Sequence, residues 1–273
     1  MKKVIYIFVL MISLTILWQC ARRGSPTGGP QDKTPPKLLS TEPKSGTTRF
    51  EQKKIRLLFD EFVITKDLRK QLIISPPMEN FPTIEPTSAS KKLEINIVDT
   101  LKPNTTYVLN FGNSIQDYNE GNPYTDFKYV FSTGDYVDSL SVKGIIKDAI
   151  SPKPDNFVSV MLYDYNEKYH DSLIYKGRPT YITNTLDSLT SFKIDYLRDG
   201  KYVMVGLKDK NNNYRFDQKE DKIAFLDTIV TVGKDTIISY ELTLFQEKLN
   251  YKAAKPSQEA ENKIIFGFEG DID

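Results

Sequence analysis

The chain has 273 residues and a mass of 31.3 kDa, enough for two domains with separate hydrophobic cores. It contains 37 Lys and Arg against 36 Asp and Glu, so it lacks the basic excess that nucleic-acid binding requires, and we expect no nucleic-acid partner. A single Cys and a single His exclude an internal disulfide framework and Cys/His zinc sites. Abundant Tyr, Phe, Pro and Gly favour many short strands joined by turns.

The N-terminus has the pattern of an export signal. Two lysines precede an apolar run at residues 4–17, which is shorter than the roughly 20 residues of a membrane-spanning helix. Cys20 follows at once, in Leu17-Trp18-Gln19-Cys20. This segment resembles the lipobox of bacterial lipoproteins, which implies that residues 1–19 are a cleaved signal peptide and that Cys20 is lipidated. The alternative is an uncleaved signal anchor with a free or buried Cys20.

Residues 20–33 are rich in Gly and Pro and have no large apolar residue, so they predict a flexible tether. Arg22 and Arg23 stand close to Cys20, where some surface-exported lipoproteins carry an acidic tract. The periplasmic face is therefore favoured over the cell surface. Attachment to the outer membrane through the N-terminal lipid is what the lipoprotein resemblance implies.

Residues 34–136 are predicted to form an all-β domain. In residues 92–98, apolar side chains at 93, 95 and 97 alternate with polar ones, which is the period of a half-buried strand. Residues 107–111 and 127–131 repeat the alternation. Residues 65–71 could form one helical turn, too short to alter this interpretation. Short strands separated by turn residues favour an antiparallel β-sandwich.

Five motifs in this region occur in the order found in a known domain family; they lie at residues 34–36, 55–63, 101–107, 115–123 and 129–134. Together they resemble the bacterial Ig-like domain of the SbsA type, which occurs in S-layer proteins and many lipoproteins. The resemblance covers residues 32–135. It implies a rigid extracytoplasmic module and brings no catalytic residues with it.

Residues 137–246 predict a second β-sandwich. Candidate strands lie at residues 142–146, 157–163, 191–195, 201–207, 223–225, 228–232 and 236–244. The pattern resembles the transthyretin-like, carboxypeptidase-regulatory class of sandwiches, and a second Ig-like domain is the alternative. Residues 247–273 read as a linker with the start of a further β element at 263–268. Either the reading frame is truncated there, or this last strand pairs back onto the second domain.

One segment of the second domain has the ligand spacing of a calcium loop. Oxygen-bearing residues stand at loop positions 1, 3, 5, 7, 9 and 12, where an EF-hand-like loop wraps one hard cation: Asp209, Asn211, Asn213, Arg215 through its backbone carbonyl, Asp217 and Glu220. Tyr214 stands where such a loop has Gly, and the flanking residues predict strands rather than helices. The alternative is an ion-free, Asn-rich turn.

These features predict two tandem antiparallel β-sandwiches behind a cleaved lipoprotein signal peptide. We expect a lipid-anchored cell-envelope protein with a non-catalytic structural or binding role, in which the Ig-like domain presents or spaces the second sandwich. The alternative is a glycan-binding accessory lipoprotein that depends on calcium. An envelope protein or a polysaccharide is the expected partner. We expect no enzyme, because His170 lies in a charged stretch and no Ser or Asp partner can be assigned to it.

Overall fold

The computed structural model describes residues 29–153, 155–186, 190–233 and 239–269. The chain divides into two units, Met1–Lys33 and Thr34–Asp273. In the first unit, residues 29–33 are exposed and have no regular secondary structure. The predicted signal peptide and Cys20 lie outside the described residues. Among the residues that are described, no helix has the length and apolarity needed to cross a membrane.

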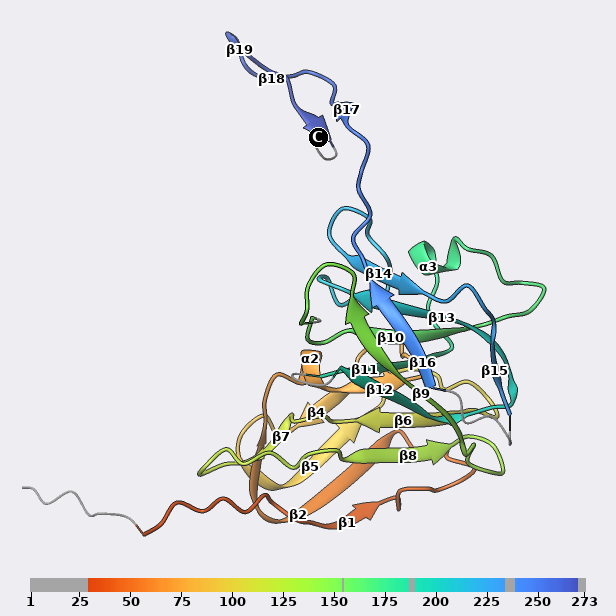
Figure 1. Ribbon diagram of the computed structural model, residues 1–273. Coiled ribbons are helices and arrows are strands. Elements are labelled where there is room, and N and C mark those ends of the chain that lie inside the picture. The colour runs from red at the N-terminus through yellow and green to blue at the C-terminus, as the bar shows by residue number, and fades with distance from the viewer. Residues whose placement is uncertain (1–28, 154, 187–189, 234–238, 270–273) are drawn as a thin grey trace, which may run out of the picture. The chain divides into compact units, whose positions relative to one another are not determined.

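The first domain consists of two antiparallel sheets (Figure 1). One sheet has the order β1 (Leu38–Glu42), β2 (Lys54–Thr65), β5 (Ser90–Asn96), β4 (Thr83–Glu85), and β7 (Ile115–Asp117) also pairs with β2. The other has the order β3 (Ile73–Ser75), β6 (Thr106–Asn110), β8 (Lys128–Ser132). Thus β3 is an edge strand of its sheet.

The core of this domain follows from the predicted alternation. Leu93 and Ile95 on β5 are fully buried, whereas Glu94 between them points to the opposite face of the sheet. Between the neighbouring strands β6 and β8, the rings of Tyr107 and Phe131 stack with their centroids 5.3 Å apart. The hydroxyl of the buried Tyr129 donates to the carbonyl of Pro43 at 2.9 Å, which satisfies its polar group.

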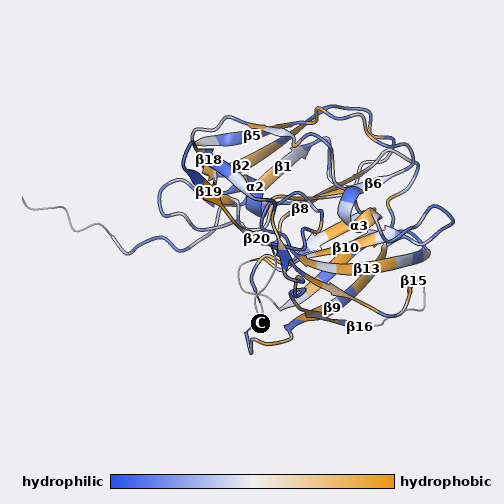
Figure 2. Cartoon of the chain, turned by 90° about the horizontal axis from the view of Figure 1, so that it is seen from above, coloured by the Kyte–Doolittle hydropathy of each residue, from blue (hydrophilic) through white to orange (hydrophobic). Residues whose placement is uncertain are grey.

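The second domain is also a pair of packed sheets, and the all-β prediction is confirmed. One sheet has the order β11 (Tyr181–Asn184), β10 (Ser159–Asp164), β13 (Gly200–Lys208), β14 (Lys222–Phe225), with β15 (Val230–Val232) also paired to β13. The other has the order β12 (Ser191–Leu197), β9 (Leu140–Asp148), β16 (Ser239–Leu244). Hydrophobic residues concentrate along β9, β10 and β13 (Figure 2).

One pairing in this domain differs from the antiparallel expectation. Strand β16 runs parallel to β9, from Ser239 opposite Lys143 to Leu244 opposite Asp148. Parallel neighbours need a crossover rather than a hairpin. The chain supplies one, because β15 belongs to the opposite sheet and the chain changes sheets before β16 begins.

Two short helices and the C-terminal segment complete the elements. The predicted helical turn is α2 (Leu68–Gln71), and α3 (Leu173–Lys176) lies where no element was predicted. Near the C-terminus, β17 (Lys252–Ala253) pairs with β20 (Phe268–Glu269), and β18 (Ser257–Ala260) pairs with β19 (Lys263–Ile265).

The expectation that the last strand pairs back onto the second domain was wrong. Strand β19 pairs with β18, inside the stretch predicted as a linker, and not with the second domain. A tight turn at residues 261–262 places the two strands side by side. Strand β18 is short, polar and exposed, so it lacks the apolar alternation on which the prediction relied.

Asp148 fixes the end of β9 to the opposite sheet. Its carboxylate accepts from the Nζ of Lys222 on β14 at 2.7 Å and from the backbone amides of Ile150 and Ser151 at 3.0 and 2.7 Å. These bonds, chiefly the one from Lys222, lower the pKa of Asp148 to about 2. The carboxylate is therefore a site at which acid should weaken the fold.

We predict that Asp148→Asn destabilises the protein at neutral pH by roughly 1–2 kcal/mol, the cost of losing a charge-assisted hydrogen bond. A carboxyl group whose pKa is lowered in the folded state stabilises above its unfolded pKa of about 3.9, and this contribution is lost as the pH falls toward about 2. Urea unfolding should thus show a gap between wild type and variant at pH 6 to 7 that closes below about pH 3. A gap that does not change with pH would show that this ion pair does not stabilise the fold.

Candidate functional site

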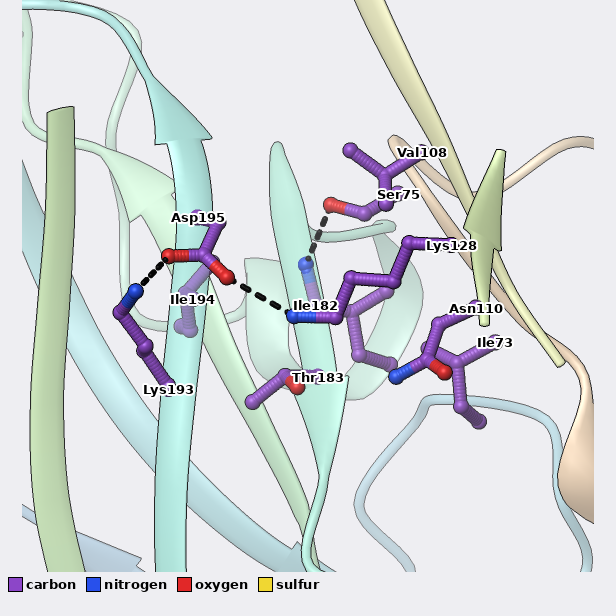
Figure 3. A pocket seen from close by; sticks show the side chains of 10 residues that line it. All are labelled: Ile73, Ser75, Val108, Asn110, Lys128, Ile182, Thr183, Lys193, Ile194 and Asp195. Atoms are coloured by element: carbon purple, nitrogen blue, oxygen red, sulfur yellow. Dashed lines mark hydrogen bonds and ion pairs between the residues drawn. The ribbon is translucent and has the colours of Figure 1, made fainter. Parts of the chain in front are cut away.

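The two sandwiches share a hydrophobic cluster at the edges of their sheets. Ile73 on β3 is only 5% exposed and belongs to a cluster whose other members all come from the second domain, Ile182 on β11 among them. The Oγ of Ser75 accepts a hydrogen bond of 3.1 Å from the backbone amide of Ile182 (Figure 3). The edge strand of one domain therefore packs against the edge strand of the other.

Next to this contact, an ion pair joins the domains. The Nζ of Lys128 on β8 lies 2.8 Å from a carboxylate oxygen of Asp195 on β12, whose other oxygen is 2.7 Å from the Nζ of Lys193 (Figure 3). Burial by itself would raise the pKa of Asp195, but the hydrogen bonds from the two lysines outweigh it and hold this pKa below its usual value. The carboxylate is therefore ionised at neutral pH and paired.

The linker between the domains, residues 133–139, is hydrogen-bonded to the first domain. The Thr106 hydroxyl donates to a carboxylate oxygen of Asp138 at 2.6 Å and accepts from the Asp138 amide at 3.0 Å. Both residues are buried. Because the linker is bonded to β6, the start of β9 has a defined position relative to the first domain.

Beside the shared cluster, the two domains form a cleft of about 550 Å³, which we call the interdomain cleft. Its first wall comes from α2, β3 and the segment before β4, and its second from Arg178 and the loop between β13 and β14 (residues 209–221), which we call the Asn-rich loop. The lining residues are Arg69, Leu72, Ile74, Pro77, Met78, Glu79, Phe81, Arg178, Asn211, Asn212, Asn213, Tyr214 and Arg215. This volume is in the usual range for small-molecule sites.

The interdomain cleft and an adjoining pocket of about 220 Å³ are rich in cations. The two share Arg69, Asn212 and Tyr214. Together they are lined by six basic residues, Arg69, Lys70, Arg178, Lys208, Lys210 and Arg215, against the two acidic residues Glu79 and Asp209. Burial lowers the pKa of Lys208, and the nearby charge of Lys70 lowers it further. The chain as a whole is almost neutral, so this region concentrates positive charge.

Two of the arginines are held by the first domain. An Nη of Arg178 donates to the carbonyl oxygen of Met78, across the domain boundary. The guanidinium of Arg69 lies 4.5 Å from the centre of the Phe81 ring, a cation–π contact. Within the described part of the chain, Arg69, Arg178 and Arg215 form no ion pair with a carboxylate.

The predicted calcium ligands lie together in the Asn-rich loop, where several of them bind backbone amides. The Asp209 carboxylate accepts from the amides of Asn211 at 3.0 Å and Tyr214 at 2.6 Å. The Asn213 side-chain oxygen accepts from the Arg215 amide at 2.8 Å, and Asp217 accepts from Lys219 in the same way at 2.9 Å. The Nδ2 of Asn211 donates to Glu220 at 3.2 Å.

Asp221 is a member of this loop that sequence reasoning missed. It is 1% exposed and accepts from the amides of Lys210 and Asp217, each at 2.9 Å. Burial raises the pKa of Asp209, and the negative charge of Asp221 adds to the effect. The twelve-residue ligand spacing ends at Glu220, so Asp221 was not considered. Its position offers a signal, because Asp221 directly precedes β14 just as Asp209 directly follows β13.

The backbone of the Asn-rich loop is strained where the sequence suggested. Tyr214, in the place of the usual Gly, has a φ of 58°, and Asn212 has a φ of 52°. Among the described residues, no three His, Cys, Asp or Glu side chains lie close enough together to hold a metal. A calcium ion here would thus need amide and backbone carbonyl oxygens in addition to carboxylates.

His170 is exposed, as expected, but it does have a serine neighbour. Its Nδ1 lies 2.6 Å from the Oγ of Ser172, two residues along the same exposed segment. The expectation that no Ser could be assigned to it was therefore wrong. A contact within one exposed turn lacks the walled cleft that positions a substrate against a nucleophile.

Comparisons with known proteins identify the first domain. Residues 32–133 match the family described as bacterial Ig-like domain, so the first sandwich is an Ig-like domain, and this fits a non-catalytic structural role. No curated protein gives a significant match to the sequence.

Solved structures give weak likenesses. The N-terminal part of the bacterial S-layer protein SbsC is 12% identical, with a TM-score of 0.26 over 63% of this chain and 40% of its own. An L,D-transpeptidase from Mycobacterium smegmatis is 14% identical, with a TM-score of 0.25 over 56% and 76%. BcpA, the major pilin subunit of Bacillus cereus, is 12% identical, with a TM-score of 0.24 over 70% and 62%. At such TM-scores none of these proteins defines the function of this chain.

The shared cluster predicts that the neighbouring residues Ile73 and Ile74 stabilise different domains. Ile73 packs into the cluster of the second domain, whereas Ile74 packs into the Ig-like core. Ile73→Ala should cost about 2–4 kcal/mol and speed amide hydrogen exchange in β10 and β11. The control Ile74→Ala should instead speed exchange in β2 and β5. If both variants perturbed only the Ig-like domain, the shared cluster would not join the two sandwiches.

Proposed function

We propose that this chain is a lipid-anchored protein of the bacterial cell envelope with a non-catalytic binding role. The interdomain cleft is the observation that carries the binding role, and the burial of Ile73 supports it by joining the two walls of the cleft. The apolar run before Cys20 supports the anchor. The Ig-like domain supports a structural part in this role. In the proposal, the module is held at the outer membrane, on the periplasmic face, and presents the interdomain cleft to an envelope protein or polysaccharide.

The second sandwich is, in this proposal, of the transthyretin-like class. Support comes from the Gly200-Lys201-Tyr202 segment, which follows a turn and opens the central strand β13. Its part is to supply the second wall of the cleft through the Asn-rich loop.

The anchor is tested at Cys20, which directly follows the apolar run of the N-terminus. Two or more lipid chains give stable membrane attachment, so the wild type should take up a clickable palmitate analogue and remain with membranes after a salt wash. Cys20→Ala should lose the label and be soluble or remain an uncleaved precursor. Equal labelling of Cys20→Ala would overturn the lipid anchor and leave the two-domain module untouched.

A second candidate function is that of a glycan-binding accessory lipoprotein that depends on calcium. The closeness of Asn211 and Glu220 in the Asn-rich loop favours it, because these residues are the third and twelfth of the ligand spacing. The buried pair of carboxylates, Asp209 and Asp221, would be stabilised by a nearby cation.

Calcium binding should appear as a rise in melting temperature in millimolar Ca²⁺. Sites of extracellular modules have dissociation constants on the order of 10⁻⁴–10⁻³ M, and a tenfold excess over this constant stabilises by about 1.4 kcal/mol. Glu220→Gln should abolish the rise, whereas Asp227→Asn, an exposed residue outside the loop, should keep it. A melting temperature that calcium does not change would identify the segment as an ion-free turn.

A further inference from the structure

We propose that the interdomain cleft binds an acidic oligosaccharide, whose carboxylate or phosphate groups pair with Arg69, Arg178 and Arg215. This inference rests on the binding role proposed above, but not on the lipid anchor or on calcium. The three guanidinium groups line one cleft and come from three separate segments of the chain.

The charge of the cleft selects an anion. Six basic residues and two acidic ones line it together with its adjoining pocket. One of the acids, Asp209, is already bonded to two backbone amides of its own loop. Guanidinium groups bind carboxylate and phosphate oxygens through paired hydrogen bonds.

The remaining lining selects a ligand rich in hydroxyl groups. Asn211, Asn212 and Asn213 follow one another along one wall, and the side chains of Asn212 and Asn213 carry both donors and acceptors. The apolar part of the lining lies in the first domain, at Leu72, Ile74, Pro77, Met78 and Phe81, whereas the amides lie in the second domain with two of the three guanidinium groups. Amides beside guanidinium groups match a sugar that carries an acidic substituent better than they match an apolar ligand.

The site is built before a ligand arrives. Arg178 is fixed by the Met78 carbonyl, and Arg69 is fixed over the Phe81 ring, so less side-chain freedom is lost on binding. In the opposite wall, Asn212 and Tyr214 keep positive φ angles of 52° and 58°. Strained non-glycine backbone persists only where its surroundings hold it, and it occurs preferentially at ligand sites.

The three asparagines beside the arginines favour a ligand that carries hydroxyl groups over a flat layer of lipid headgroups. A nucleic acid is disfavoured as well, because the net charge of the chain is only +1.

Calorimetry on the full chain in a nonionic detergent tests the proposal. The probes are trigalacturonic acid, its neutral methyl ester, a phosphorylated pentamannose, inorganic phosphate and vesicles of anionic phospholipid. We expect saturable binding of an acidic saccharide, weakened by salt. R69Q/R215Q should weaken it about 100-fold, at about tenfold for each lost charged hydrogen bond. K44Q/K153Q removes two exposed charges outside the cleft and should leave the affinity within about twofold.

The two acidic saccharides separate a carboxylate ligand from a phosphate ligand, and tight binding of either one supports the proposal. The proposal is overturned if neither binds saturably at about 1 mM, if the methyl ester binds equally well, or if R69Q/R215Q has no effect. Inorganic phosphate binding as tightly as the saccharides, or preference for vesicles, would overturn it too. None of these results would change palmitate labelling at Cys20. Failure of the oligosaccharide proposal can therefore be distinguished from failure of the lipid anchor.

Discussion

The structure depends on one contact, the burial of Ile73 from the Ig-like domain in a hydrophobic cluster of the following domain. An edge strand such as β3 exposes unpaired backbone groups and must be covered. Here β11 lies beside it, and the amide of Ile182 bonds to Ser75. Lys128 and Asp195 add a paired charge at the same boundary. Apolar burial and satisfied polar groups therefore act together to join the domains.

The cleft is a consequence of this junction. Arg69 and Phe81 belong to the Ig-like domain, and Arg215 and the three asparagines belong to the Asn-rich loop of the second domain. If the domains moved freely, these groups would not line one recess. Fixed relative to each other, they combine a dense positive charge with amide groups although the chain as a whole is nearly neutral. A rigid scaffold that carries a site on its loops is a common way to build a binding protein.

Sequence reasoning reached the fold but not the cleft. Alternation of apolar and polar residues, such as that around Leu93 and Ile95, indicates a strand with one buried face, so it identified the strands. It could not tell that Ile73 faces another domain while Ile74 faces its own, because both are isoleucines in one short apolar run. Arg178 and Met78 are 100 residues apart, and no local pattern connects them. The strain at Tyr214 was foreseen, because the ligand spacing demands a Gly there.

Rigidity between the two domains is the central claim, and the distance between them measures it most directly. In a Cys20→Ser background, spin labels at Lys53→Cys and Lys201→Cys would report from exposed positions of the first and the second domain. Double electron–electron resonance should give one narrow distance distribution, with a width set by the labels themselves. A broad or two-peaked distribution would mean that the domains reorient, and would contradict a fixed cleft.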